Sequence, residues 1–115
     1  MDNVNRNMDE QEFKTRADAA LESLYKRLSA ATDEFDFEPD FNSGALAIEF
    51  DEPKAKFVVS PNTPVRQIWV SAHSRSFKLD WDEGRSTFVL PETGQSLNEL
   101  MSSVIAQQIG EEVTL

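Results

Sequence analysis

The 115-residue chain is long enough for one domain with one hydrophobic core, and 39% hydrophobic with 28% charged residues is typical of a soluble globular protein. Its net charge of −10 disfavours nucleic acid and anionic membranes as partners and favours cations and basic proteins. The absence of cysteine excludes disulfides, thiolate metal sites and a cysteine nucleophile.

The N-terminal residues are polar and have little to bury, so we expect a flexible tail over residues 1–8 and a single domain over residues 9–115. No apolar run approaches the ~18 residues that suggest a membrane span. The N-terminus has no apolar signal region, and the lack of cysteine fits a reducing compartment, so we expect a cytoplasmic protein.

A first helix is predicted from Asp9 to Thr32, because apolar residues recur there at spacings of three and four. The members of this apolar stripe are Phe13, Ala17, Ala20, Leu21, Leu24, Leu28 and Ala31. Acidic residues in the first turn suit the positive end of the helix dipole.

Aromatic and acidic residues alternate from Phe35 to Phe41, which predicts a strand with its carboxylates on one side. Pro39 lacks a backbone donor, so this strand is expected to be short or at a sheet edge. Five more strands joined by short turns predict an antiparallel meander. They are Ala45–Phe50, Ala55–Ser60, Arg66–Ser71, Phe77–Trp81 and Thr87–Leu90, with a loop at Ala72–Ser76.

A second helix is predicted from Leu97 to Ile109. Ser96 and Glu99 have the spacing of a capping box, and Gly110 suits the position after a helix. The order of helix, strands and helix predicts an α+β fold. We expect a two-layer α-β sandwich, with an antiparallel sheet of about six strands and both helices packed on one face.

Trp69 stands out because the alternation around it directs it away from the core. If Ile68 and Val70 point inward, Trp69 points outward with Gln67, and Lys78 would share that face. Exposed aromatic residues are enriched where partners bind. The alternative is cross-strand packing against Gln67 or a lysine stem without any partner.

The negative charge is concentrated in residues 9–52, which hold 13 acidic and four basic side chains. Carboxylate oxygens suit Fe(II), Mn(II), Ca(II) or Mg(II). Alternate strand residues lie roughly 6–7 Å apart, so we expect weak, exposed binding of several ions and no tight cage. The alternative is a solvated acidic face that only keeps the protein soluble.

Catalytic motifs are absent from the sequence. An EF-hand starting at Asp36 would place Phe41 and Ala47 where glycine and glutamate are needed. His73 is the only histidine, and no nucleophile elbow, P-loop or HExxH accompanies it. We therefore expect an exposed loop histidine and no enzyme.

The segment Pro64–Ser71, followed by Asp80-Trp81, resembles the signature strand region of the frataxins. The opening of the first helix at Asp9–Phe13, the turn at Asn42–Leu46 and the end at Gln107–Val113 resemble the bacterial, CyaY-type members. The resemblance covers nearly everything from Met8 onward.

The resemblance implies an iron-binding regulator or adaptor of iron–sulfur cluster assembly. Such a protein docks on the cysteine desulfurase and scaffold complex, donates or senses weakly bound Fe(II)/Fe(III), and carries no organic cofactor. It is expected to be a monomer, or an oligomer driven by iron. The alternatives are a ferroxidase or iron-storage protein and an iron-independent acidic interaction module.

Carried over to this sequence, the resemblance implies two sets of site residues. The metal-binding set is Glu10, Glu12, Asp18, Glu22, Asp33, Asp36 and Glu38. The partner-binding set is Asn62, Gln67, Trp69 and Lys78.

The sequence departs from the family at Lys14, where bacterial members can carry a histidine, and in the late first helix, which is usually acidic. Lys26 and Arg27 should repel a cation there. We therefore expect iron at the two ends of the acidic region, near Glu10/Glu12 and Asp33–Asp40.

Overall fold

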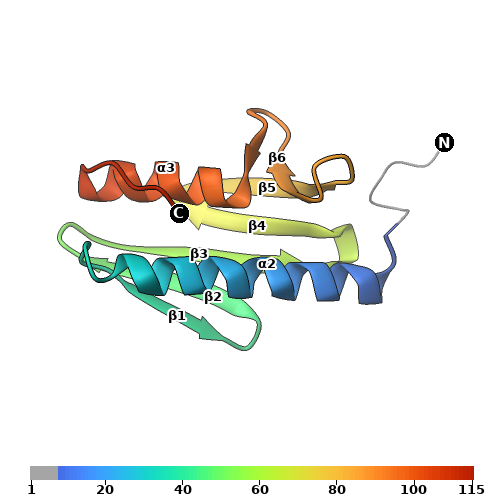
Figure 1. The fold of residues 1–115 in the computed structure, drawn as a ribbon, viewed down its shortest axis with the longest axis horizontal. Helices are drawn as coiled ribbons and strands as arrows, with labels where there is room; N and C mark the ends of the chain where they lie inside the picture. Colours follow the sequence, from blue (N-terminus) through green and yellow to red (C-terminus); the bar gives the residue numbers. More distant parts are fainter. Residues whose placement is uncertain (1–7) are drawn as a thin grey trace.

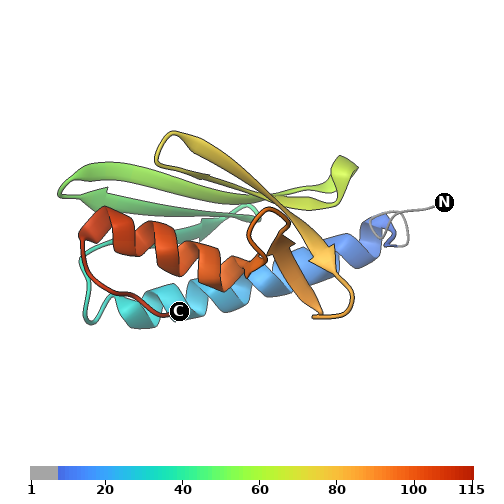
Figure 2. The same cartoon turned by 90° about the horizontal axis from the view of Figure 1, so that it is seen from above.

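Two layers make up the fold, a twisted antiparallel sheet and two helices that cover one of its faces (Figures 1 and 2). The structure is a computed structural model and describes residues 8–115. Its elements are α2 (Glu10–Ala31), β1 (Glu38–Asn42), β2 (Ala45–Asp51), β3 (Lys54–Asn62), η1 (Thr63–Val65), β4 (Gln67–Ala72), β5 (Arg75–Asp82), β6 (Thr87–Leu90), β7 (Gln95–Ser96) and α3 (Leu97–Ile109). The strands form one seven-stranded sheet in chain order, which confirms the predicted sandwich and adds the two-residue β7.

Both helices begin at side-chain caps, of which the sequence predicts the second. The Asp9 carboxylate accepts a hydrogen bond from the Glu12 amide at 2.7 Å, and Ser96 and Glu99 form the predicted capping box. Helix α2 lies along β1–β3 and η1, whereas α3 contacts β6 and β7 (Figure 1). Among residues 8–115, neither helix is long and apolar enough to cross a membrane.

The core lies between the helices and the inner face of the sheet. Its fully buried strand residues follow the predicted alternation and include Leu46, Ile48, Phe57, Val59, Ile68, Val70 and Leu79. Phe13 of α2 contacts Phe88 of β6 edge to face, with 5.9 Å between ring centroids. Among residues 8–115, no helix covers the outer face of the sheet (Figure 2).

Strand β1 starts at Glu38, so the prediction of a strand from Phe35 is wrong for its first residues. The Phe35 amide donates to the Ala31 carbonyl at 3.0 Å, so Phe35 lies in the turn that follows α2. The Phe37 ring is buried and packs 5.8 Å from Phe50. Asp36 therefore lies in the connection before β1 and does not share the strand face of Glu38.

The predicted loop at Ala72–Ser76 is instead a tight hairpin whose turn is His73-Ser74. Both residues have left-handed φ values, 54° and 60°, which match the strand twist in a two-residue turn. The sequence lacks the usual Asn-Gly signal, so the turn was missed. His73 is half-buried, against our expectation, because its Nε2 lies 2.9 Å from the Val104 carbonyl and its ring packs on Phe57.

Met8 is buried, with 3% of its surface exposed, although we expected it in the flexible tail. Its sulfur lies 3.5 Å from Nη1 of Arg16, and its carbonyl accepts a hydrogen bond from Nε of Arg66 at 3.3 Å. Residues 1–7 of the predicted tail lie outside the described residues.

Candidate functional site

Seven carboxylates follow α2, the turn after it and the start of β1, and we call them the acidic ridge. They are Glu10, Glu12, Asp18, Glu22, Asp33, Asp36 and Glu38. The ridge therefore extends along the length of α2, through the turn after it and into the start of β1. Its three parts differ in how their charge is balanced.

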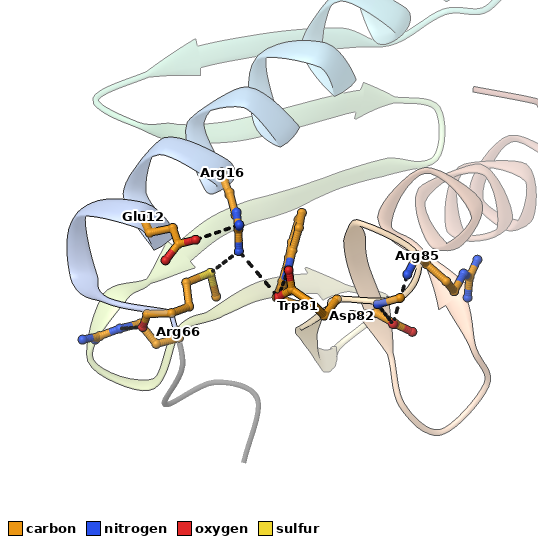
Figure 3. A network of polar contacts seen from close by, with 9 residues as sticks. Glu12, Arg16, Arg66, Trp81, Asp82 and Arg85 are labelled. Atoms are coloured by element: carbon orange, nitrogen blue, oxygen red, sulfur yellow. Dashed lines mark hydrogen bonds and ion pairs between the residues drawn. The ribbon is translucent and has the colours of Figure 1, made fainter. Parts of the chain in front are cut away.

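The N-terminal part of the ridge is neutralised by basic residues one helical turn away. Lys14 Nζ lies 3.1 Å from Glu10, and Arg16 Nη2 lies 2.7 Å from Glu12 (Figure 3). The Arg16 guanidinium also stacks 4.5 Å from the centroid of the Trp81 ring. Arg16 thus connects Glu12 of the ridge with Trp81 near the end of β5.

The middle of the ridge consists of Asp18 and Glu22, one turn apart on the exposed face of α2. They border a shallow depression that Phe41 and Gly44 of the β1–β2 hairpin complete. Within residues 8–115 neither carboxylate forms an ion pair. This part of the ridge keeps its full negative charge.

The C-terminal part of the ridge holds Asp33, Asp36 and Glu38, which are all exposed. In the register of the outer face, Glu38 stands opposite Glu49. Ion pairs to these carboxylates are absent from the described part of the chain. Adjacent like charges without a partner raise the local negative potential and favour a cation or a basic protein.

No three acidic or histidine side chains of residues 8–115 converge closely enough to hold a metal ion. The ridge carboxylates lie singly or in pairs, and those of its middle and C-terminal parts are open to solvent. Such an array suits weak and exchangeable ligation, because each ion would keep most of its water ligands.

The four predicted partner residues lie together on the outer face of the sheet, and we call Asn62, Gln67, Trp69 and Lys78 the sheet-face patch. Trp69 Nε1 donates to Gln67 Oε1 at 2.9 Å, and the Lys78 ammonium lies 4.9 Å above the indole ring. Asn62 faces Gln67 across the β3–β4 pair. Gln67 Nε2 donates in turn to Asp80 Oδ1 at 3.0 Å, which adds an acidic residue at the border.

Trp69 points outward as the alternation predicts, but it is half-buried by its own neighbours. Its N–H has an acceptor and its ring carries a cation, so the alternative of cross-strand packing describes the free protein correctly. The Lys78 ammonium covers one face of the indole ring. The patch therefore presents the indole ring of Trp69 with the Lys78 ammonium above it and the Asp80 carboxylate at its border.

An antiparallel sheet covered on one face by N- and C-terminal helices, with an acidic edge and a polar outer face around a tryptophan, defines a frataxin-like class of protein. The sequence matches the frataxin-like domain over residues 6–111. The chain belongs to the frataxin family, in its bacterial CyaY-type branch.

The matches to named relatives cover most of this chain and most of each relative. The sequence is 30% identical to the iron-sulfur cluster assembly protein CyaY of Azotobacter vinelandii over 81% of this chain and 86% of that one. It is 31% identical to the CyaY protein of Ralstonia nicotianae over 92% of this chain and 93% of that one. The structure of frataxin from Psychromonas ingrahamii superposes with a TM-score of 0.73 over 93% of this chain and 97% of that one, at 24% identity, and supports the fold.

Proposed function

We propose that this protein acts in iron–sulfur cluster assembly, as an adaptor that docks on the cysteine desulfurase and scaffold proteins. The name of its CyaY relatives, iron-sulfur cluster assembly protein, supports the process. The observation that carries the docking proposal is the set of exposed carboxylates from Asp18 to Glu38, which form no ion pair within residues 8–115, together with a hydrogen-bonded aromatic patch on the outer face of the sheet. Together they offer a basic partner both charge complementarity and an aromatic anchor.

Iron ligation is proposed at the middle and C-terminal parts of the ridge. Lys14 and Arg16 would repel a divalent cation from Glu10 and Glu12, and binding there would require breaking two ion pairs. Within residues 8–115, Asp18, Glu22 and the segment Asp33–Asp40 have no such ion-pair partner. The proposed iron sites therefore include Asp33–Asp40, one of the two ends expected from the sequence. They also include Asp18 and Glu22 in the middle of the helix, and they leave out the end at Glu10 and Glu12.

Docking driven by exposed charges should weaken with salt, because the Debye length is about 8 Å at physiological ionic strength. The sheet-face patch would depend on salt less, because its contact with a partner rests on the indole surface. Measuring binding over a range of salt concentrations therefore separates the contribution of the acidic ridge from that of the sheet-face patch.

The test is a reconstituted cysteine desulfurase and scaffold assay, with binding measured by pull-down in the presence and absence of Fe(II). We expect the protein to bind and to change the rate of sulfide or cluster formation. The double variant Asp36→Asn, Glu38→Gln should lose iron-induced NMR broadening near β1, whereas the matched control Glu10→Gln should keep it. Absence of binding and of any rate change at all iron concentrations would overturn the proposal. Oxygen consumption with Fe(II) separates it from a ferroxidase.

A further inference from the structure

Half of β5 forms an open edge of the sheet. Strand β6 pairs with β5 only at Asp80, Trp81 and Asp82, whereas β4 pairs with β5 from Arg75 to Asp80. The first half of β5 consequently has a neighbour on one side only. Figure 2 shows the β4–β5 hairpin extending beyond the short β6.

The direction of the free backbone groups follows from the two-residue turn. A hairpin of this length makes its closing pair, Ala72 and Arg75, a hydrogen-bonded pair, and such pairs alternate along antiparallel strands. Phe77 and Leu79 therefore bond to β4, and the amide groups of Ser76 and Lys78 point to the open edge. Within residues 8–115 no backbone hydrogen bond reaches Ser76 or Lys78 from that side.

The segment that follows β6 does not complete this edge. Continuing the β5–β6 register places Pro91 opposite Lys78, and proline has no N–H to donate. After Leu90 the chain turns back, because the amides of Thr93 and Gly94 both donate to the Leu90 carbonyl. The edge at Ser76 stays open.

A cavity of about 410 Å³ lies directly beside this edge, between the β4–β5 hairpin, the loop before β7 and helix α3. Its apolar lining comes from Phe77, Leu90, Leu100 and Val104. The bond between His73 Nε2 and the Val104 carbonyl fixes the hairpin against α3, so the walls of the cavity are held in place.

Arg75 lies at the mouth of the cavity with its guanidinium 4.9 Å from the centroid of the Phe77 ring. Within the described residues it forms no ion pair. Glu92 lines the cavity as well. The Arg75 cation, stacked on an aromatic ring beside an open strand edge, is therefore the group that is complementary to a carboxylate carried on an extended chain.

We propose that this cleft binds an extended peptide segment of another protein, which adds to β5 as a short antiparallel strand. Its central residue would exchange two main-chain hydrogen bonds with Ser76. The residue before the central one lies opposite Phe77, faces the cavity and is apolar. The residue after it lies opposite Arg75 and is acidic. The inference is independent of iron and of the desulfurase, and its failure leaves the proposed function untouched.

The probe is the acetylated and amidated pentapeptide Ser-Leu-Ala-Glu-Ser, and its control has the central alanine N-methylated. Binding is followed by amide NMR shifts and hydrogen exchange at millimolar peptide, the range in which such a short segment binds. We expect shifts at Arg75–Lys78 and in the cavity wall of α3, with slower exchange of the Ser76 amide in the complex. N-methylation should weaken binding about tenfold, because one hydrogen bond is lost and the methyl group blocks the approach.

The variant Arg75→Gln should weaken binding of the glutamate peptide by about two- to fivefold, as for an exposed ion pair. It should leave binding of the matching glutamine peptide unchanged, and the distant control Lys26→Gln should affect neither. Equal binding of the N-methylated peptide, shifts outside the cleft or no shifts at all would each overturn the proposal. Because Arg75 is exposed, its replacement leaves the core intact and the test does not depend on a destabilised variant.

Discussion

Replacing Arg16 by glutamine removes the side chain that joins the start of α2 to the end of β5. Its guanidinium makes the 2.7 Å contact with Glu12, lies 3.9 Å from Glu83 and stacks on Trp81 at 4.5 Å (Figure 3). Trp81 is held in turn by a hydrogen bond of 3.1 Å from its Nε1 to Glu83. The network connects residues 65 positions apart in the sequence.

The expected loss of stability follows from these contacts. A surface ion pair between residues one helical turn apart contributes about 0.3–0.5 kcal/mol. A cation stacked on an aromatic ring at a half-exposed site contributes about 0.5–1 kcal/mol. Arg16→Gln should therefore lower the free energy of unfolding by about 1–1.5 kcal/mol, which corresponds to a Tm lower by about 4–6 °C in a domain of this size.

Two further variants separate the contribution of the ion pair to stability from that of the stacking on Trp81. Glu12→Gln should cost about 0.5 kcal/mol, because Arg16 keeps its place on Trp81. Glu10→Gln is a matched control, since it loses a first-turn charge and the ion pair with Lys14 without touching an aromatic ring. Urea unfolding of the three variants in low salt and in about 1 M NaCl gives the comparison.

High salt should reduce the loss of unfolding free energy in both glutamate variants. It should leave most of the loss in Arg16→Gln, because stacking on Trp81 is less screened than an exposed ion pair. Equal deficits for Arg16→Gln and Glu10→Gln would refute the reasoning, since Arg16 would then act as an ordinary surface charge. A deficit of Arg16→Gln that disappears in high salt would refute it as well.

Further variants test the sheet-face patch, the hairpin turn and the pH dependence. Trp69→Ala should weaken binding to the proposed partner by about tenfold or more, as for a buried aromatic anchor. Ser71→Ala, on the same strand face, should not weaken it. Equal affinity of Trp69→Ala and the parent protein in a pull-down would contradict a role of the sheet-face patch in docking. His73→Ala should cost about 2 kcal/mol in urea unfolding, because it loses the bond to the Val104 carbonyl and places alanine at a left-handed φ, and His73→Asn should cost less. The backbone hydrogen bond from Ser96 is the main cause that holds the pKa of Glu99 below its usual range. Stability from Glu99 is therefore present above the pKa of the unfolded chain and is lost as pH falls through the lower folded value, so Glu99→Gln should be less stable than the parent at pH 7 and equal to it in acid. A difference that persists at low pH would contradict this cause.

The helices and most strands could be predicted because their signals are local. The spacing of Phe13, Leu21 and Leu28 fixes one face of α2, and the Ser96 and Glu99 pair marks the start of α3. Alternation along β4 likewise determines that Trp69 leaves the core. The failures concern segments in which a distant contact prevails over the local pattern. His73 is held by the Val104 carbonyl of α3, and Met8 is held by Arg16 and Arg66.

The sequence by itself determined the two layers, the outward direction of Trp69 and the acidic character of the first helix and first strand, because side-chain periodicity and charge are properties of neighbouring residues. Tertiary structure decided which of these residues act together. The register set by the His73-Ser74 turn places Lys78 over Trp69, and the packing of α2 on the sheet lets Arg16 reach Trp81 at the end of β5. The open edge at Ser76 also depends on where β6 ends. Such pairings arise from strand register and helix packing, which no local pattern encodes.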